Sequence, residues 1–479
     1  MRAAALRPAH WAVPGGLAVL GAIVFSWRLG ASSYFVDEAT SINIISGSVR
    51  HLLDYVRSYE TSPPTYFLFL DVWAHVVGSH GEVAARLPSA LGGAGVVVSV
   101  WYFARMLAGD AAGAIAGLLA LCSPLVLQYA QQARMYTFVM LFATLAAIAA
   151  VRAARTGSSR WLAGSCGLAI IAVSFHYVAW LVAVPMWIWL MQNGRLAARR
   201  KRLSTIALVA IGALWAPVAL AEFSRFPNGG IGVNGALTVR HAMHVVAAPF
   251  NGRSVAPTAL AEPLAIVILL VCAARVESLR RDRSDREPDL ILGMALVPIT
   301  ALLLLGVAGR DLVITRYATV AAPFMIALIA VAIASVPSLA IRVAGGAIVL
   351  TIAVAGAIRS FDSSHFYPNG RGLMRYVAAH WRPTDAVVYN GMGDPDNLLT
   401  PTAFYARRYL PAGFETVIAP PFATRQFGRL QASSRRLWIV NETGPHAPTG
   451  PAMPAGYRIA QSTTFNAAMG LRVLLAVPG

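Results

Sequence analysis

The sequence predicts an α-helical polytopic membrane protein, with about eleven transmembrane helices, that ends in an extracytoplasmic α/β domain. Of its 479 residues, 57% are hydrophobic and only 13% are charged, whereas soluble proteins carry about 25% charged residues. The mean hydropathy of +0.61 agrees with this comparison. From Arg359 onward the long apolar runs stop, and strand-like segments alternate with helix-like ones, which indicates a separate domain.

The formal net charge of +18 does not indicate a nucleic-acid-binding protein. The basic residues gather in short loops between apolar runs, where the orientation rule for membrane proteins places them. Nearly all of them are arginine, and Lys201 is the one lysine. The charge therefore reports membrane topology.

The first 30 residues resemble a signal peptide, since Arg2 and Arg7 precede an apolar stretch and then small residues. Because many further spans follow, we expect a retained signal anchor. The three cysteines, Cys122, Cys166 and Cys272, each lie inside an apolar run and form no CxxC pair. The sequence therefore supports neither a disulfide framework nor a zinc knuckle.

A helix needs about 20 residues to cross a bilayer, and apolar runs with at most one charged residue mark the candidate spans. These runs are 12–29, 88–106, 111–129, 134–151, 161–175, 177–193, 204–221, 257–274, 290–308, 317–336 and 341–358. The stretch 161–194 is compatible with one long tilted helix or with two short helices that meet near His176 and Tyr177.

Loop charge decides between these two possibilities. The segments 152–160, 195–202 and 275–287 are rich in arginine, and positive loops stay in the cytoplasm. Only two short helices within 161–194 put all three loops on that side. The sequence then predicts a cytoplasmic N-terminus and an outer C-terminal tail.

This topology places four segments and the tail outside: 30–87, a turn around 130–134, 222–256, 309–316 and 359–479. We therefore divide the chain into a transmembrane domain, residues 1–358, whose outer loop 30–87 carries the candidate site, and an extracytoplasmic α/β domain, residues 359–479.

The tail has strand-like runs and helix-like runs in alternation. The predicted strands are 386–389, 415–419, 436–440 and 471–476, and the predicted helices are 371–381, 402–409 and 423–433. No GxGxxG or P-loop pattern opens any of these helices, so nucleotide binding is unsupported there. We interpret Asp394-Pro395-Asp396 as a turn rather than as a metal-binding D-x-D motif.

Carboxylates in the first outer loop are the first candidates for chemistry. Asp37 and Glu38 follow the first apolar run, and either can act as a general base or merely stabilise a helix N-terminus. Glu60 precedes Pro63-Pro64, which predicts a rigid entry into a helix. It is either a helix cap or a second carboxylate that shares a divalent cation such as Mg²⁺ or Mn²⁺.

Arginines at the outer ends of spans are the second group of candidates. Arg134, shortly before Tyr136, and Arg316 can anchor in lipid headgroups or clamp a phosphate with their planar forks. His176 is compatible with a hydrogen-bonded interface residue, a metal ligand or a substrate contact. His241 and His244 are spaced for one helix face, but no third metal ligand follows from the sequence.

The order and spacing of these motifs resemble the membrane-embedded glycosyltransferases of the GT-C fold. The likeness is to family-39/83-type enzymes, which include bacterial lipid A galacturonic acid and aminoarabinose transferases and protein O-mannosyltransferases. The stretches that carry it are Asp37-Glu38, 62–67, Glu82 through Arg86 to Ser89, Ser123-Pro124 running into 133–136, and Arg316-Tyr317 followed by Pro323.

The resemblance implies a polyprenyl-phosphate-linked sugar donor, a lipid, glycan or protein acceptor at the outer face, and a bacterial inner-membrane location. Asp37 matches the family's acidic catalytic residue, with Glu38 beside it. Glu60 matches a loop acid that holds the site or a metal, and Arg86 and His176 are grouped with it as assisting residues. Some relatives carry Lys or His where Ser62 stands, so we expect Arg134, Tyr136 and Arg316 to contact the donor phosphate.

Two other functions remain as alternatives. A transporter or flippase of lipid-linked sugars would place ionisable groups at the membrane midplane, whereas these span interiors are nearly free of charge. An O-antigen-ligase-like enzyme would carry a large central outer loop with Arg and His, and the 222–256 segment is modest by that measure. The glycosyltransferase is the preferred interpretation.

Overall fold

The computed structural model describes most of the chain and divides it into two compact units. The described residues are 9–60, 62–192, 195–225, 237–251, 261–282, 286–310, 312–361, 369–390, 401–418, 435–442, 456–466 and 471–479. The first unit comprises Met1–Leu29 and Gly47–Phe361, and the second comprises Gly30–Ser46 and Asp362–Gly479. The second unit therefore joins a short segment after the first helix to the C-terminal tail.

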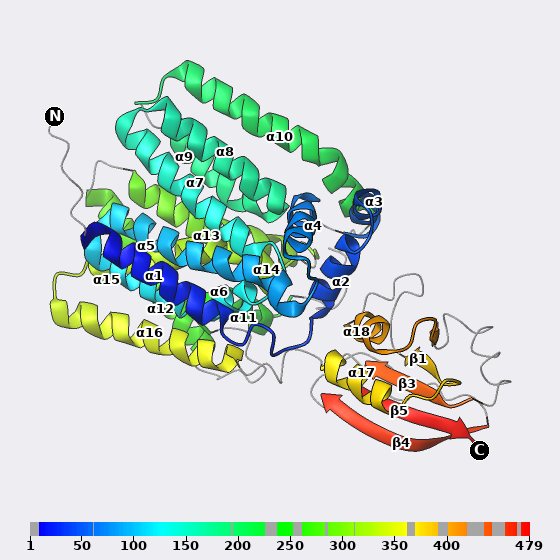
Figure 1. The fold of residues 1–479 in the computed structure, drawn as a ribbon. Helices are drawn as coiled ribbons and strands as arrows, with labels where there is room; N and C mark the ends of the chain where they lie inside the picture. The colour runs from blue at the N-terminus through cyan, green and yellow to red at the C-terminus, as the bar shows by residue number, and fades with distance from the viewer. Residues whose placement is uncertain are drawn as a thin grey trace. The chain divides into compact units, whose positions relative to one another are not determined.

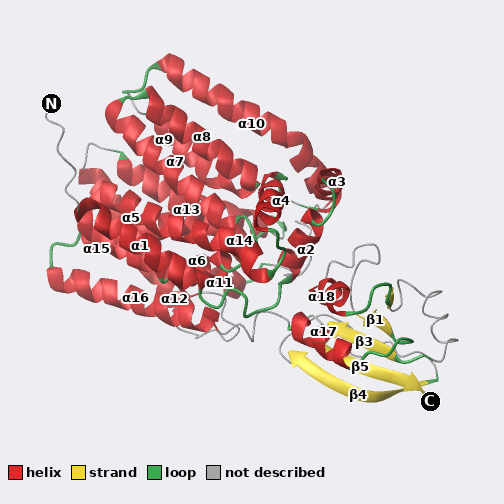
Figure 2. Ribbon diagram, in the orientation of Figure 1, coloured by secondary structure: helices red, strands yellow, loops and turns green. Residues whose placement is uncertain are grey.

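The first unit consists of helices in the part of the chain that the structure describes (Figures 1 and 2). Their bounds are α1 Ala9–Ser26, α3 Val49–Tyr59, α4 Thr65–Val77, α5 Glu82–Leu121, α6 Pro124–Ala130, α7 Tyr136–Thr156, α8 Ser159–Phe175, η1 Tyr177–Ala179, α9 Trp180–Met191, α10 Ala198–Arg225, α11 Val239–Asn251, α12 Ala261–Asp282, α13 Glu287–Val307, α14 Thr315–Ala318, η2 Thr319–Ala321, α15 Ala322–Ala334 and α16 Leu339–Phe361.

Each of the predicted apolar runs overlaps one of these helices. Within the described residues, six helical stretches are long and apolar enough to cross a membrane: Glu82–Leu121, Tyr136–Thr156, Ala198–Leu220, Glu287–Val307, Thr315–Ala334 and Leu339–Phe361. Four shorter apolar helices accompany them: Ala12–Ser26, Thr65–Val77, Ser159–Phe175 and Tyr177–Met191. The polytopic helical class is confirmed, and the count of eleven spans stays a prediction.

Helix α5 is a hairpin of two antiparallel arms. Its backbone leaves the helical region at Ala108 and Gly109, where Gly109 has a φ of 83°. A Cβ added at Gly113 would lie 2.8 Å from the Cβ of Arg105 and 3.1 Å from the carbonyl oxygen of Trp101. Residues eight apart in a straight helix are about 12 Å apart, so the chain reverses at Gly109. The two runs predicted on either side of this turn are therefore separate arms.

The stretch 161–194 forms two short helices, as loop charge predicted. Helix α8 ends at Phe175, and His176 takes an extended conformation, with φ −161° and ψ 135°, before η1 and α9 begin. An extended residue cannot continue a helix, so the chain turns back at this point.

The reversal brings the arginine-rich loops together at one end of the unit. Arg155 makes a bidentate ion pair with Glu287, with N–O distances of 2.6 and 2.7 Å. Arg195 donates a hydrogen bond to the carbonyl of Arg155 at 2.8 Å, and Arg200 donates to the carbonyl of Gly157 at 3.0 Å. Segments 152–160 and 195–202 and the start of α13 at Glu287 thus lie at the same end of the helices, which a single long helix would have prevented.

The second unit holds helix α2 Val36–Ile45 and a small α/β fold. Its other elements are α17 Gly370–Ala379, β1 Ala386–Asn390, α18 Pro401–Tyr409, β2 Glu415–Ile418, β3 Leu437–Glu442, β4 Tyr457–Asn466 and β5 Leu471–Pro478. The strands are ordered β2-β1-β3-β5-β4, with β1 parallel to β2 and β3, and β5 antiparallel to β3 and β4.

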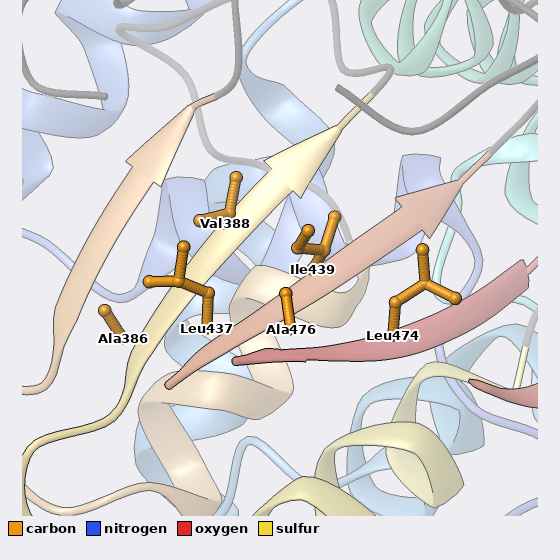
Figure 3. Packing of buried hydrophobic residues seen from close by; sticks show 6 residues of the cluster. All are labelled: Ala386, Val388, Leu437, Ile439, Leu474 and Ala476. Carbon is orange, nitrogen blue, oxygen red and sulfur yellow. The ribbon is translucent and has the colours of Figure 1, made fainter. Parts of the chain in front are cut away.

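Alternate residues of the central strands form the core of this sheet. Six side chains pack together on one face, as Figure 3 shows: Ala386, Val388, Leu437, Ile439, Leu474 and Ala476. Because side chains in a strand alternate between faces, residues two apart share this surface. These apolar residues led to the prediction of the three central strands from the sequence.

Where the structure describes them, the predicted tail elements agree with it, and one strand was missed. Strand β4 was missed because it lies at the sheet edge and is mostly solvent-exposed, so it carries Gln, Ser and Thr instead of an apolar repeat. The predicted helix 423–433 and the Asp394-Pro395-Asp396 turn lie outside the described residues.

Candidate functional site

Glu60 is held in a turn between two helices of the first unit. Helix α3 ends at Tyr59, and Glu60 takes an extended conformation as its C-terminal cap, with φ −89° and ψ 160°. Ser62 Oγ donates a hydrogen bond to Glu60 Oε2 at 3.3 Å. Pro63 and Pro64 then lead into α4, as the sequence predicted. The turn fixes the carboxylate at one place on the helical unit.

Arg134 lies in the turn between α6 and α7, beside that carboxylate. Ser89 Oγ on α5 donates to the backbone carbonyl of Arg134 at 3.0 Å, which fixes the turn. The arginine is 5% exposed. Its Nη1 lies 3.8 Å from Glu60 Oε1, and its guanidinium carbon lies 6.0 Å from the ring centroid of Phe67. Glu60 and Arg134, far apart in the chain, therefore share a poorly solvated environment.

His176 packs between two tyrosines at the same end of the unit. Its ring centroid lies 5.6 Å from that of Tyr136 and 5.5 Å from that of Tyr317. The backbone N–H of Val178 donates to His176 Nδ1 at 3.1 Å. A ring nitrogen that accepts this bond carries no proton, so the neutral ring carries its proton on Nε2.

The electrostatics of His176 show that both predicted arginines belong to this cluster. His176 is 5% exposed and lies in the turn between helices. Burial lowers its pKa to about 3, and the positive charges of Arg134 and Arg316 act in the same direction. The ring is therefore neutral at physiological pH and offers an N–H donor.

Arg316 opens helix α14 and is half-buried. Its guanidinium carbon lies 5.9 Å from the ring centroid of the following residue, Tyr317. Because Tyr317 contacts His176, the start of α14 lies against the turn that follows α8. We call the group of Glu60, Arg134, Tyr136, His176 and Arg316 the arginine–histidine cluster.

The cluster lies at the end of the helices opposite the arginine-rich loops. Helix α7 begins at Tyr136 in the cluster and ends at Thr156, beside Arg155, and α8 runs back from Ser159 to Phe175, beside His176. The 21 residues of α7 span roughly 30 Å at 1.5 Å per residue. The arginine–histidine cluster and the arginine-rich loops are thus separated by the length of one membrane span.

Arg86, predicted as an assisting residue, has a structural contact in the helical unit. It is 1% exposed on α5, and its Nη1 donates to the backbone carbonyl of Leu29 at 2.8 Å. This bond ties the end of the first helix region to α5. The assisting role of Arg86 stays a prediction.

Asp37 and Glu38 belong to the second unit, on the first turn of α2. Glu38 is fully buried, and its Oε2 accepts a hydrogen bond from the backbone N–H of Phe35 at 2.9 Å. This is a capping interaction at the helix N-terminus. Asp37 is half-buried, and Ser41 Oγ donates to its backbone carbonyl. The Glu38 carboxylate therefore holds the start of the helix.

Metal ligation finds little support in the described residues. Across the described ranges, no group of three or more His, Cys, Asp or Glu side chains is placed to hold an ion. Glu60 is an oxygen ligand of the right kind, but the Arg134 guanidinium lies beside it. His244 pairs instead with Glu262 of α12, with Nδ1 2.9 Å from Oε1. A divalent cation at this site therefore stays a prediction.

Sequence reasoning missed the aromatic residues that enclose the cluster. Tyr129 on α6 contacts Tyr136 edge-on, with centroids 4.7 Å apart, and Phe67 lies under Arg134. A tyrosine on each side of the Gln131–Arg134 turn was the available signal. This pair of tyrosines did not predict a binding site, because aromatic residues are common at the ends of membrane helices that have no such site.

Comparisons with known proteins were made on sequence and on structure. Residues 61–220 match a family model described as dolichyl-phosphate-mannose-protein mannosyltransferase. This region includes Ser62, Arg134 and His176. A search of curated proteins finds no relative.

Solved structures of two membrane proteins share the fold. ArnT from Cupriavidus metallidurans, in the apo state, matches with a TM-score of 0.59 at 15% identity, and 98% of each chain is covered. The same protein bound to undecaprenyl phosphate gives a TM-score of 0.54 at 15% identity, again over 98% of each chain. AglB from Archaeoglobus fulgidus, in complex with an inhibitory peptide and a dolichol-phosphate, gives 0.54 at 11% identity and covers 91% of this chain and 69% of that one.

These likenesses establish the architecture. The chain is a multi-pass membrane protein with the fold of ArnT over nearly its whole length. The GT-C-type fold expected from the order and spacing of the motifs is confirmed.

Proposed function

We propose that this protein is a membrane glycosyltransferase that moves a sugar from a polyprenyl-phosphate donor to a hydroxyl of a lipid, glycan or protein acceptor. The observation that carries the proposal is the arginine–histidine cluster. It gathers two arginines, a neutral histidine and one glutamate in a poorly solvated, aromatic environment. Two positive charges against one negative charge leave an excess suited to a phosphate.

The relatives support a lipid-phosphate donor. The matched family model is named for a dolichyl-phosphate-mannose donor, and structures of ArnT and AglB hold undecaprenyl phosphate and dolichol-phosphate. All of these are lipid phosphates that reside in a bilayer. The phosphate headgroup of such a lipid lies at the membrane surface, and the cluster lies at the ends of membrane helices. The cluster is therefore placed to bind it.

The chemistry needs positive charge on the leaving group. In the transfer, the acceptor oxygen bonds to the anomeric carbon, the bond from that carbon to the phosphate oxygen breaks, and the polyprenyl phosphate leaves. Arg134 and Arg316 would neutralise the developing phosphate charge, which is worth most where water is excluded. His176 would donate its Nε2–H to a phosphate oxygen.

Asp37 is the proposed general base, which takes the proton from the attacking hydroxyl. Its competitors are engaged elsewhere, since Glu38 caps α2 and Glu60 lies beside Arg134. The motif in which Asp37 stands also matches the acidic residue of the resembled family.

We also propose that the protein lies in a bacterial inner membrane with its N-terminus in the cytoplasm and its tail outside. The support is the clustering of three arginine-rich loops at one end of the helices. The arginine–histidine cluster would then face outward. A transporter is the weaker alternative, because the matched family model is that of a transferase.

The proposal is tested by offering radiolabelled polyprenyl-phosphate sugars and acceptor lipids to the purified protein in detergent. We expect transfer of label to the acceptor, and a fall of roughly 10²–10⁴-fold in turnover for Asp37→Asn, the usual worth of a general base. The same variant should bind undecaprenyl phosphate normally.

Two further variants identify the carboxylate. Normal turnover in Asp37→Asn, with Glu38→Gln or Glu60→Gln inactive, would show that another carboxylate is the base. Full activity in all three variants would count against a glycosyltransferase that uses a carboxylate base.

A further inference from the structure

The segment that carries Asp37 is built into the second unit with the tail. Residues 30–46, which we call the Asp37 segment, lie more than 300 residues before α17 and α18 in the chain, yet they form one compact unit with them. Since α2 is only 10 residues long, and isolated helices shorter than about 12 residues are marginal, its geometry depends on what it packs against.

Arg371 binds the entry of the segment. It is the second residue of α17, and its guanidinium donates to the carbonyl of Gly30 at 3.1 Å and to the carbonyl of Ala31 at 2.8 Å. The backbone N–H of Arg371 also donates to Ser33 Oγ at 3.1 Å. The guanidinium bonds hold the backbone carbonyls of Gly30 and Ala31 just before α2, so they fix the path of the chain there.

Tyr405 binds the same segment one turn before Asp37. Its hydroxyl accepts the backbone N–H of Tyr34 at 2.9 Å, and Tyr34 is fully buried. The rings of these two tyrosines are nearly parallel, with centroids 6.3 Å apart, and Phe404 contacts Tyr34 edge-on at 5.3 Å. An N–H directly before a helix is thereby satisfied by the tail.

The far end of α2 is held as well. Arg407 Nη1, on α18, donates to Asn43 Oδ1 at 3.0 Å. Asn43 is in the last turn of α2, six residues after Asp37. Contacts before the first turn and in the last turn together restrict both the position and the tilt of the helix.

We propose that α17 and α18 of the tail orient the Asp37 carboxylate, with Arg371 and Tyr405 as positioning residues. The inference rests on the proposed role of Asp37 as base. It assigns the tail a function inside the catalytic step. Displacement of a catalytic group by 1 Å can cost about 10²-fold in rate, so the tail controls turnover through backbone contacts.

The experiment compares two variants with two control variants on α18. Arg371→Ala removes the carbonyl contacts, and Tyr405→Phe removes one hydroxyl while keeping the ring. The controls are Arg408→Ala, an exposed residue of α18, and Tyr409→Phe, whose ring stacks on Tyr405 at 6.1 Å. We expect kcat to fall about tenfold or more in the first pair, with the donor KM and undecaprenyl phosphate binding unchanged, and neither control should differ from the parent.

A double-variant cycle separates positioning from general damage to the fold. Each change is repeated in the Asp37→Asn protein, where no oriented base remains to be displaced. We expect Arg371→Ala and Tyr405→Phe to cause no further loss there. Amide hydrogen exchange at Tyr34 should also become faster in Tyr405→Phe than in Tyr409→Phe.

The outcomes distinguish this inference from the proposed function. Normal turnover in Asp37→Asn would overturn the assignment of the base, and the positioning role with it. If Asp37→Asn is impaired, then normal kcat in Tyr405→Phe and Arg371→Ala, or a full further loss in the double variants, would overturn the positioning role alone. Arg371→Lys, which keeps the charge but replaces the forked guanidinium with a single ammonium, gives a milder version of the same measurement should Arg371→Ala fold poorly.

Discussion

At the scale of single residues, the proposed donor site uses arginines, and we expect their shape to matter as much as their charge. Arg134 and Arg316 both act on the buried ring of His176. A guanidinium presents a planar fork that matches two phosphate oxygens, whereas an ammonium acts as a point charge. The two arginines should therefore not be replaceable by lysine.

We expect Arg134→Lys and Arg316→Lys to weaken the binding of undecaprenyl phosphate, and the alanine variants to weaken it further. One lost charge-assisted hydrogen bond is worth about 1.5–3 kcal/mol, or roughly tenfold to a hundredfold in affinity. Equilibrium binding of the labelled lipid measures this, with exposed Arg310→Ala as control. Unchanged binding in both alanine variants would count against a phosphate site.

The histidine makes stability depend on pH. The pKa of His176 is lowered to about 3 in the folded protein, against an ordinary value of 6.5. Below pH 6.5 the unfolded chain binds a proton at His176 that the folded protein excludes. The free energy of unfolding therefore decreases as the pH is lowered. The loss from this group is about 1.4 kcal/mol per pH unit and ends near the folded value.

We expect His176→Gln, which keeps an N–H donor and cannot titrate, to lose less thermal stability than the parent between pH 7 and pH 4.5. Thermal unfolding in detergent at the two pH values measures the difference. Parallel losses in both proteins would show that His176 does not carry the effect.

At the scale of elements, the turn inside α5 requires glycine. Gly109 has a φ of 83° and a ψ of −174°, a conformation that side chains with a Cβ rarely adopt. A Cβ added there would meet nothing within 4 Å, so a substitution tests the backbone alone. Such strain costs about 1–3 kcal/mol.

We expect Gly109→Ala to lower the unfolding temperature measured in detergent. Gly164, in the middle of α8, is the matched control, because a Cβ there also meets nothing within 4 Å and its backbone is helical. Gly164→Ala should be neutral or stabilising, by up to about 1 kcal/mol. Equal effects of the two substitutions would mean that the turn at Gly109 does not depend on glycine.

At the scale of the whole molecule, the loops determine the orientation of the chain in the membrane. We expect alkaline phosphatase to be active when it is fused after Arg359, and inactive when it is fused within 195–202. The enzyme folds only outside the cytoplasm, so its activity reports the side on which each junction lies. Activity from the second fusion would contradict the proposed topology, and a fusion within 152–160 provides an independent control for the cytoplasmic side.

The sequence by itself determined the membrane class, the helix positions and the division of 161–194 into two helices. These properties depend on local hydrophobicity and on loop charge, which are written in consecutive residues. The same holds for the three central strands of the tail, whose apolar residues repeat with the period of a buried sheet face. It does not hold for β4, because an exposed edge strand carries no such repeat.

Only the tertiary structure decided which candidate residues meet. It brought Glu60, Arg134, His176 and Arg316 into one cluster and engaged Glu38 as a helix cap. It also joined the Asp37 segment to Arg371 and Tyr405, more than 300 residues away. Each of these contacts joins side chains or carbonyls from distant turns, and no periodicity or spacing in a single sequence records which turns pack together.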